Sequence, residues 1–74
     1  MSKQQGGVRL TLYEKQYYCE CRGYRIRAQP EEKQFRMQLF KNGELLKTAE
    51  LVDARALPAA YAQKYTALYE YLIK

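Results

Sequence analysis

The sequence predicts an α+β domain in which a small, curved antiparallel sheet of four or five strands carries one C-terminal α-helix on its apolar face. Side-chain polarity alternates with a period of two over the first two thirds of the chain and with a period near 3.6 over the last third. The chain has 74 residues, 47% of them hydrophobic, which suits one two-layer domain and argues against disorder. We expect this domain over residues 8–74, after a short flexible tail over residues 1–7.

The first two strands are expected over residues 8–13 and from Gln16 onward, with a tight turn at residues 14–15 between them. Their apolar sets are Val8, Leu10 and Leu12 in the first strand and Tyr17, Cys19 and Cys21 in the second. In this register the two sets face each other, and Arg9 meets Glu20 on the opposite face. Every cross-strand pair is then compatible, which is how register is normally specified.

Gly23 marks a change of parity. The apolar residues that follow it are Tyr24, Ile26 and Ala28, which are out of step with the apolar set before it. Either Gly23 is a β-bulge within one bent strand, or Arg22 and Gly23 form a two-residue hairpin turn. The bent strand is favoured, because arginine is a poor first residue for a turn that needs a positive φ. Both interpretations make Gly23 a conformational requirement.

Residues 35–41 form the next expected strand, after a polar turn over residues 29–33 in which Pro30 ends the preceding strand. If that turn is a four-residue loop, Ala28 lies opposite Phe35 on the apolar face. On the outer face the same register places Arg27 directly opposite Arg36, and like charges in that position repel each other.

Asn42-Gly43 is the strongest hairpin signal in the chain. It leads into a further strand over about residues 44–51. The alternation of polar and apolar residues in that strand is too poor to fix its register.

The C-terminal helix is expected from about Ala56, with Pro58 in its first turn, where a missing N–H costs nothing. Asp53 is a candidate cap, although a helix that began there would hold Pro58 in its interior. The main apolar stripe consists of Leu57, Tyr61, Tyr65, Leu68 and Leu72. A weaker stripe, Tyr69 with Ile73, is a candidate second interface for a partner or a homodimer.

The residue inventory argues against catalysis. The chain has eight Tyr but no His, which removes the commonest general base and the commonest metal ligand. It also lacks a glycine-rich phosphate loop, so we expect no enzyme activity and no cofactor. No apolar run approaches the roughly 20 residues that span a bilayer, and the first residues lack the apolar core of a signal peptide. We therefore expect a cytoplasmic protein with no membrane partner.

The two cysteines are expected to be buried, reduced and free of metal. A structural zinc site needs four ligands, and Cys19 with Cys21 supplies only two. Only a dimer that shares four thiolates closes such a site. On one strand both thiols instead read as small hydrophobic residues of the core.

The outer sheet face is the candidate binding site. The formal net charge is +5, and arginines alternate there with aromatic and amide side chains, which suits phosphates and bases. The candidate residues are Arg22, Arg25, Arg27, Arg36, Tyr18, Phe40 and Gln38. One interpretation is a small nucleic-acid-binding protein, for single or double strands. The other is a small phage- or plasmid-type inhibitor that binds an acidic surface of a host protein. Arg27 and Arg36 are expected at the centre of the site.

Overall fold

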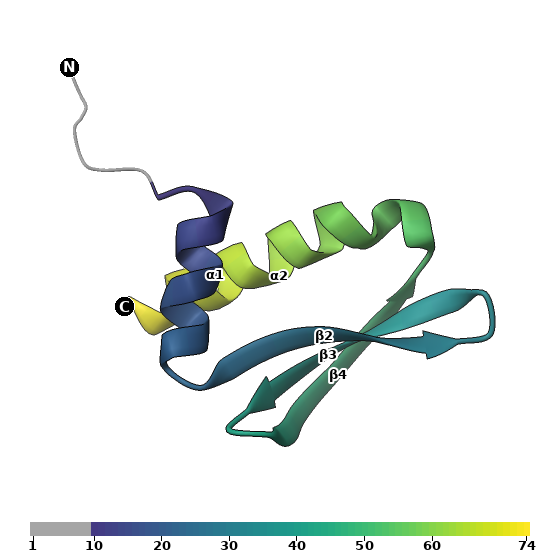
Figure 1. Cartoon of the computed structure of the whole chain (residues 1–74), viewed down its shortest axis with the longest axis horizontal. Helices are drawn as coiled ribbons and strands as arrows, with labels where there is room; N and C mark the ends of the chain where they lie inside the picture. Colours follow the sequence, from purple (N-terminus) through teal and green to yellow (C-terminus); the bar gives the residue numbers. More distant parts are fainter. Residues whose placement is uncertain (1–9) are drawn as a thin grey trace.

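The computed structural model describes residues 10–74, so the tail expected over residues 1–7 lies outside the described residues. Its elements are α1 (Leu12–Cys21), β2 (Tyr24–Glu31), β3 (Gln34–Lys41), β4 (Glu44–Val52), the short 3-10 helix η1 (Ala54–Ala56) and α2 (Leu57–Leu72). The strands form one antiparallel sheet in the order β2-β3-β4, and α1 and α2 lie together on one side of it (Figure 1). The α+β class and the C-terminal helix are confirmed, but the described residues form three strands instead of four or five.

The missing strands are replaced by helix α1. Residues 8 and 9 lie outside the described residues, and the remainder of the two expected N-terminal strands is a helix with its start at Leu12. Thr11 and Glu14 form a capping box: the Thr11 hydroxyl accepts the Glu14 N–H at 3.1 Å, and the Glu14 carboxylate accepts the Thr11 N–H at 2.8 Å. These two bonds satisfy backbone donors that a helix start leaves open, and they stabilise the helix against the strand. The predicted pairing of these two strands is therefore wrong.

Gly23 ends α1 and starts β2, so it is neither a bulge nor part of a β-hairpin. Its φ of +90° confirms the expected conformational requirement. The N–H groups of Arg22 and Gly23 donate to the carbonyls of Cys19 and Glu20 at 3.1 and 3.0 Å, which closes the helix. A Cβ built on Gly23 collides with the Asn42 side-chain oxygen, and the Gly23 carbonyl accepts the Asn42 N–H at 2.8 Å. The turn therefore packs directly against the β3–β4 hairpin.

The register between β2 and β3 differs by two residues from the predicted one. Ala28 lies opposite Met37, not opposite Phe35. The reason is the turn, which is short and uses a positive φ of 56° at Glu32, so that β2 continues through Pro30 to its end at Glu31. The predicted contact of Arg27 with Arg36 is consequently wrong. Arg27 faces Gln38, and Arg36 faces Gln29.

The hairpin between β3 and β4 is confirmed at Asn42-Gly43. Both residues have a positive φ, 52° and 86°, as a type I′ turn requires. The β3–β4 ladder then shifts register twice, once between Arg36 and Gln38 and once between Leu39 and Phe40. These shifts are the physical reason why the sequence of β4 does not alternate cleanly.

The core lies between the two helices and the inner face of the sheet. Its buried members are Cys19, Ile26, Met37, Ala60, Tyr65 and Leu68. The predicted stripe of α2 is confirmed, because Tyr65 and Leu68 are buried and its other residues pack against that cluster. Asp53 caps η1 by accepting the Ala56 N–H at 3.0 Å, and Pro58 lies in the first turn of α2. The predicted cap at Asp53 and the predicted place of Pro58 in a first turn are thus both correct, because they belong to two consecutive helices.

Candidate functional site

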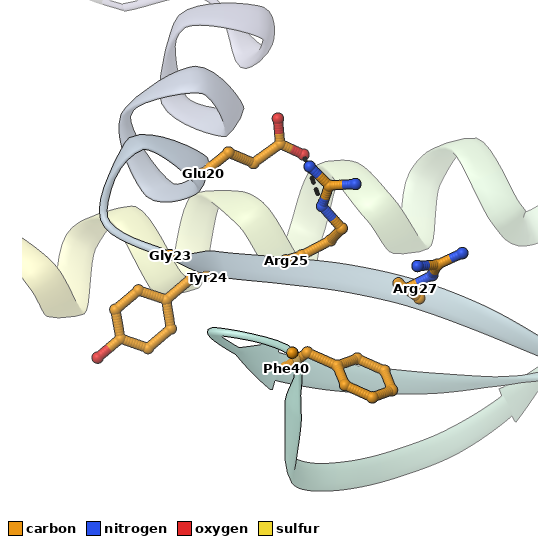
Figure 2. Close-up of a pocket in the computed structure, with 7 residues that line it drawn as sticks. Glu20, Gly23, Tyr24, Arg25, Arg27 and Phe40 are labelled. Carbon is orange, nitrogen blue, oxygen red and sulfur yellow. Dashed lines mark ion pairs between the residues drawn. The ribbon is translucent and has the colours of Figure 1, made fainter.

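Four of the predicted residues meet on the outer side of the sheet, where Arg25 and Arg27 lie at the β2 edge and also border the helices. Because Ile26 and Met37 point toward the core, their strand neighbours point the other way. The pairs across the strands are Arg25 with Phe40 and Arg27 with Gln38. We call the hollow at this position the Phe40 pocket. It has a volume of about 370 Å³ and is lined by Glu20, Gly23, Tyr24, Arg25, Arg27, Phe40 and Gly43 (Figure 2).

The two arginines of the Phe40 pocket differ in charge compensation. Arg25 reaches from β2 toward Glu20 on α1, with 3.9 Å between Nε and the carboxylate oxygen (Figure 2). The Arg25 side chain is 58% exposed, so this ion pair is weak. Arg27 is exposed and forms no ion pair with any of residues 10–74. Arg27 is therefore the cation of the pocket that is most available to an anionic ligand.

Glu20 is held by other groups besides Arg25. Its Oε2 accepts the Tyr65 hydroxyl at 3.1 Å and the Gln16 side-chain amide at 3.2 Å. The same Tyr65 oxygen accepts the Ile26 N–H at 3.0 Å. These hydrogen bonds hold the Glu20 carboxylate in place at the rim of the pocket, and Glu20 in turn keeps Arg25 near α1. The Phe40 ring therefore remains exposed to the pocket.

Arg36 shares the outer face but is already occupied. Two of its nitrogens donate to the two oxygens of Glu31, each at 3.2 Å, and a third donates to the Ala49 carbonyl at 3.2 Å. The hydrogen bonds that Arg36 donates to Glu31 raise the pKa of Arg36 above its usual value. The prediction that Arg36 is a central binding residue is therefore not supported by its geometry, since its guanidinium braces β2, β3 and β4.

Arg22 and Tyr18 lie on the helix side, not on the outer face. The Arg22 guanidinium stacks over the Tyr18 ring at 3.5 Å and donates to the Tyr18 carbonyl at 3.2 Å. The Tyr18 ring in turn meets Tyr69 edge-on, with 5.1 Å between ring centroids. This contact covers much of the predicted second interface and leaves only Ile73, which is 51% exposed.

The cysteines are placed differently from each other. Cys19 is fully buried, and burial raises the pKa of its thiol. Cys21 is exposed, so the prediction that both cysteines are buried is wrong. On a strand, residues two positions apart share a face, but on helix α1 they point in nearly opposite directions. Residues 10–74 contain no group of three or more side chains arranged to hold a metal ion.

Two residues of the site were not predicted. Tyr24 lines the Phe40 pocket, and the Lys41 ammonium lies 5.0 Å from its ring centroid. The sequence predicts Glu20 on the second strand, opposite Arg9, and its place beside Arg25 follows only from a helix over its own segment. The Thr-x-x-Glu spacing at Thr11 was the sequence signal for that helix.

Comparison of the chain with protein families, with curated proteins and with solved structures gives no match. Among the described residues, neither helix is long and apolar enough to cross a bilayer. The functional conclusion therefore depends on the geometry and charge of the site.

Proposed function

We propose that the protein is a non-enzymatic nucleic-acid-binding protein and that its ligand is a single strand held at the Phe40 pocket. The observation that carries the proposal is one flat ring on an open sheet face, with Arg25 directly opposite and Gln38 and Arg27 beside it. A ring stacks on any base, a guanidinium binds the adjoining phosphate, and an amide bonds to a base edge.

The shape of the pocket favours a single strand over a duplex. Phe40 is half-buried between the side chains that rise on both sides of it, so its ring reaches only a base that leaves its own stack. In a duplex the base faces are covered by their neighbours, whereas single strands present them. The volume of about 370 Å³ lies at the small end of ligand sites and leaves room for a base.

The charge of the whole chain supports the same partner. The formal net charge of +5 attracts a polyanion, and Arg27 provides an uncompensated cation at the pocket. Binding of this kind weakens as salt rises, because each phosphate contact releases counterions.

The test is a fluorescence anisotropy titration with labelled oligothymidylate and oligouridylate of about 12 nucleotides, and with a duplex, at about 50 and about 200 mM salt. Arg27→Gln should reduce the slope of log affinity against log salt by about 0.7. Arg55→Gln on η1 removes the same charge away from the pocket and is the matched control.

Phe40→Leu isolates the ring. It keeps an apolar side chain of similar size, so folding is retained, but it removes the stacking surface. The affinity for the single strand should fall by about 5- to 150-fold, the equivalent of about 1–3 kcal/mol, with the salt slope unchanged. If Arg27→Gln and Phe40→Leu both bind like Arg55→Gln, the Phe40 pocket is not the site.

One observation favours the second candidate, an inhibitor-like protein that binds an acidic protein surface. Leu45 lies opposite Phe40 on the same face and is 50% exposed, which suits an apolar protein contact better than a phosphate chain. In that case the wild type binds none of the oligonucleotides. A nuclease-treated lysate then yields a stoichiometric protein partner that is lost in both Leu45→Asp and Arg27→Gln.

A further inference from the structure

Helix α1 carries an exposed aromatic face. Tyr13 is 77% exposed, Tyr17 is 63% exposed, and Cys21 is also exposed. The spacing of four residues places all three on one side of the helix. The neighbouring Cys21 thiol raises the pKa of Tyr17 above its usual value. We call these three residues the α1 outer face. A shallow groove of about 320 Å³ runs along it, lined by Leu10, Tyr13, Glu14, Tyr17, Tyr18, Cys21 and Arg22.

The side of α1 that faces the domain is also packed. There Cys19 is fully buried, and Tyr18, at the edge of the groove, packs against Tyr69 of α2. A helix on the surface of a small domain normally has one apolar stripe and one charged face, and a helix that is apolar on both sides is normally covered on both. The sheet and α2 cover only one side of α1 (Figure 1). Within the part of the chain that the structure describes, residues 10–74, nothing covers the aromatic α1 outer face.

We propose that the α1 outer face binds a second copy of this chain, with the two α1 helices antiparallel across a two-fold axis. The argument for this occupant is charge. Glu14 and Arg22 line the same groove, one near each end of α1. They are separated by eight positions, or about 12 Å along a helix axis. A two-fold axis at the level of Tyr18 reverses this order, so that Glu14 of each copy lies level with Arg22 of the other.

Within residues 10–74, neither Glu14 nor Arg22 forms an ion pair, so both charged groups are available for these contacts. Arg22 is exposed and uses one nitrogen for the Tyr18 carbonyl, so most of its five N–H donors point elsewhere. The capping box uses Glu14 Oε1, and the other carboxylate oxygen remains to accept a guanidinium. The contact thus holds two ion pairs around stacked tyrosines, and it is self-complementary as an isologous interface must be.

A single pair of helices buries a small area, so we expect a dimer that dissociates in the micromolar range. Sedimentation equilibrium from about 5 to about 500 µM should therefore show a mass that rises from one chain to two. Tyr17→Glu should keep the monomer mass throughout. Tyr71→Glu is the matched control, because Tyr71 lies on α2 and is 68% exposed.

Charge exchange gives the decisive test. Glu14→Lys and Arg22→Glu each place like charges together in the homodimer, and each should weaken it about tenfold. An equimolar mixture restores both ion pairs and should regain the dimer mass that neither variant shows alone. Because Glu14→Lys also removes a cap bond, its helicity is compared with that of Glu14→Gln, which keeps the cap.

The exposed thiol provides an independent readout. In the proposed arrangement the two Cys21 thiols lie on the order of 10 Å apart, by helix rise and spacing. A bis-maleimide of about that span should join two wild-type chains but not Cys21→Ser or Tyr17→Glu, and Tyr71→Glu should cross-link normally. The proposal is overturned by a monomer mass at every concentration, or by a charge-exchange mixture no heavier than its components.

Discussion

Replacing Tyr65 with phenylalanine tests the network that joins both helices to the sheet. The Tyr65 side chain is 2% exposed, and its hydroxyl accepts the Ile26 N–H at 3.0 Å while it donates to Glu20 at 3.1 Å. Tyr65→Phe keeps the ring in the core and removes only the oxygen. The variant therefore measures two hydrogen bonds with little change in packing.

The expected loss can be worked out from the two partners. The Ile26 N–H becomes a buried donor without an acceptor, which costs about 1–3 kcal/mol. Glu20 keeps its bond from Gln16 at 3.2 Å and is partly open to water, so its loss is about 0.5–1 kcal/mol. We expect the free energy of unfolding to fall by about 1.5–4 kcal/mol, a large share of the total stability of a domain of this size.

Urea unfolding at neutral pH, followed by far-ultraviolet circular dichroism, measures this loss. The midpoint should fall while the dependence on urea concentration stays unchanged. Tyr71→Phe is the control on the same helix, and it should change stability by less than about 0.5 kcal/mol. If Tyr65→Phe behaves like Tyr71→Phe, the Ile26 N–H does not depend on the hydroxyl and the reasoning fails.

The same residue predicts a pH dependence. Burial raises the pKa of Tyr65 from the usual 10.0 to about 12. The folded state then holds the phenol proton more tightly than the unfolded state does. This contribution is complete below about pH 10 and is lost as the pH rises toward 12, by at most about 2–3 kcal/mol. The stability difference between wild type and Tyr65→Phe should therefore narrow over that window, and a constant difference contradicts the assignment.

Three further outcomes follow from the fold. Gly23→Val should lower the free energy of unfolding by roughly 1–3 kcal/mol, because the residue needs a positive φ and its Cβ meets Asn42; an unchanged urea midpoint contradicts this turn. In native protein a thiol reagent should label Cys21 rapidly and Cys19 only on unfolding, and two fast equivalents contradict the helix. Thr11→Ala should cost about 1 kcal/mol in thermal or urea unfolding, whereas Thr11→Ser should cost much less; equal losses contradict the capping box.

The helix α1 shows where sequence patterns mislead. The segment from Tyr17 to Cys21 alternates in polarity and is rich in residues that favour strands. What decides its structure is the capping box at Thr11 and the burial of Cys19 against α2, with its sulfur 3.9 Å from the Tyr65 carbonyl. The first signal is visible in the sequence, but the second needs a contact between residues that are 46 positions apart.

The candidate site shows which predictions survive an error of register. A shift of two residues preserves the face of every side chain, so Arg25, Arg27, Gln38 and Phe40 stay together on the outer face. The same shift changes every partner. The turn between β2 and β3 is short and has a positive φ at Glu32, and this places Glu31 beside Arg36. The sequence contains no clear signal for a turn of that length.

The treatment of its two edges makes this sheet a poor template for further strands. On the β2 side, the outward N–H of Ile26 already donates to the Tyr65 hydroxyl. Pro30 has the same parity in the strand, so the next-but-one outward position lacks an N–H altogether. On the β4 side, two register shifts bend the last strand away from a straight ladder. A fourth strand from another molecule finds no regular row of donors and acceptors at either edge. Concentrated solutions of the folded protein should accordingly resist fibrillar growth, and any association must proceed through side chains.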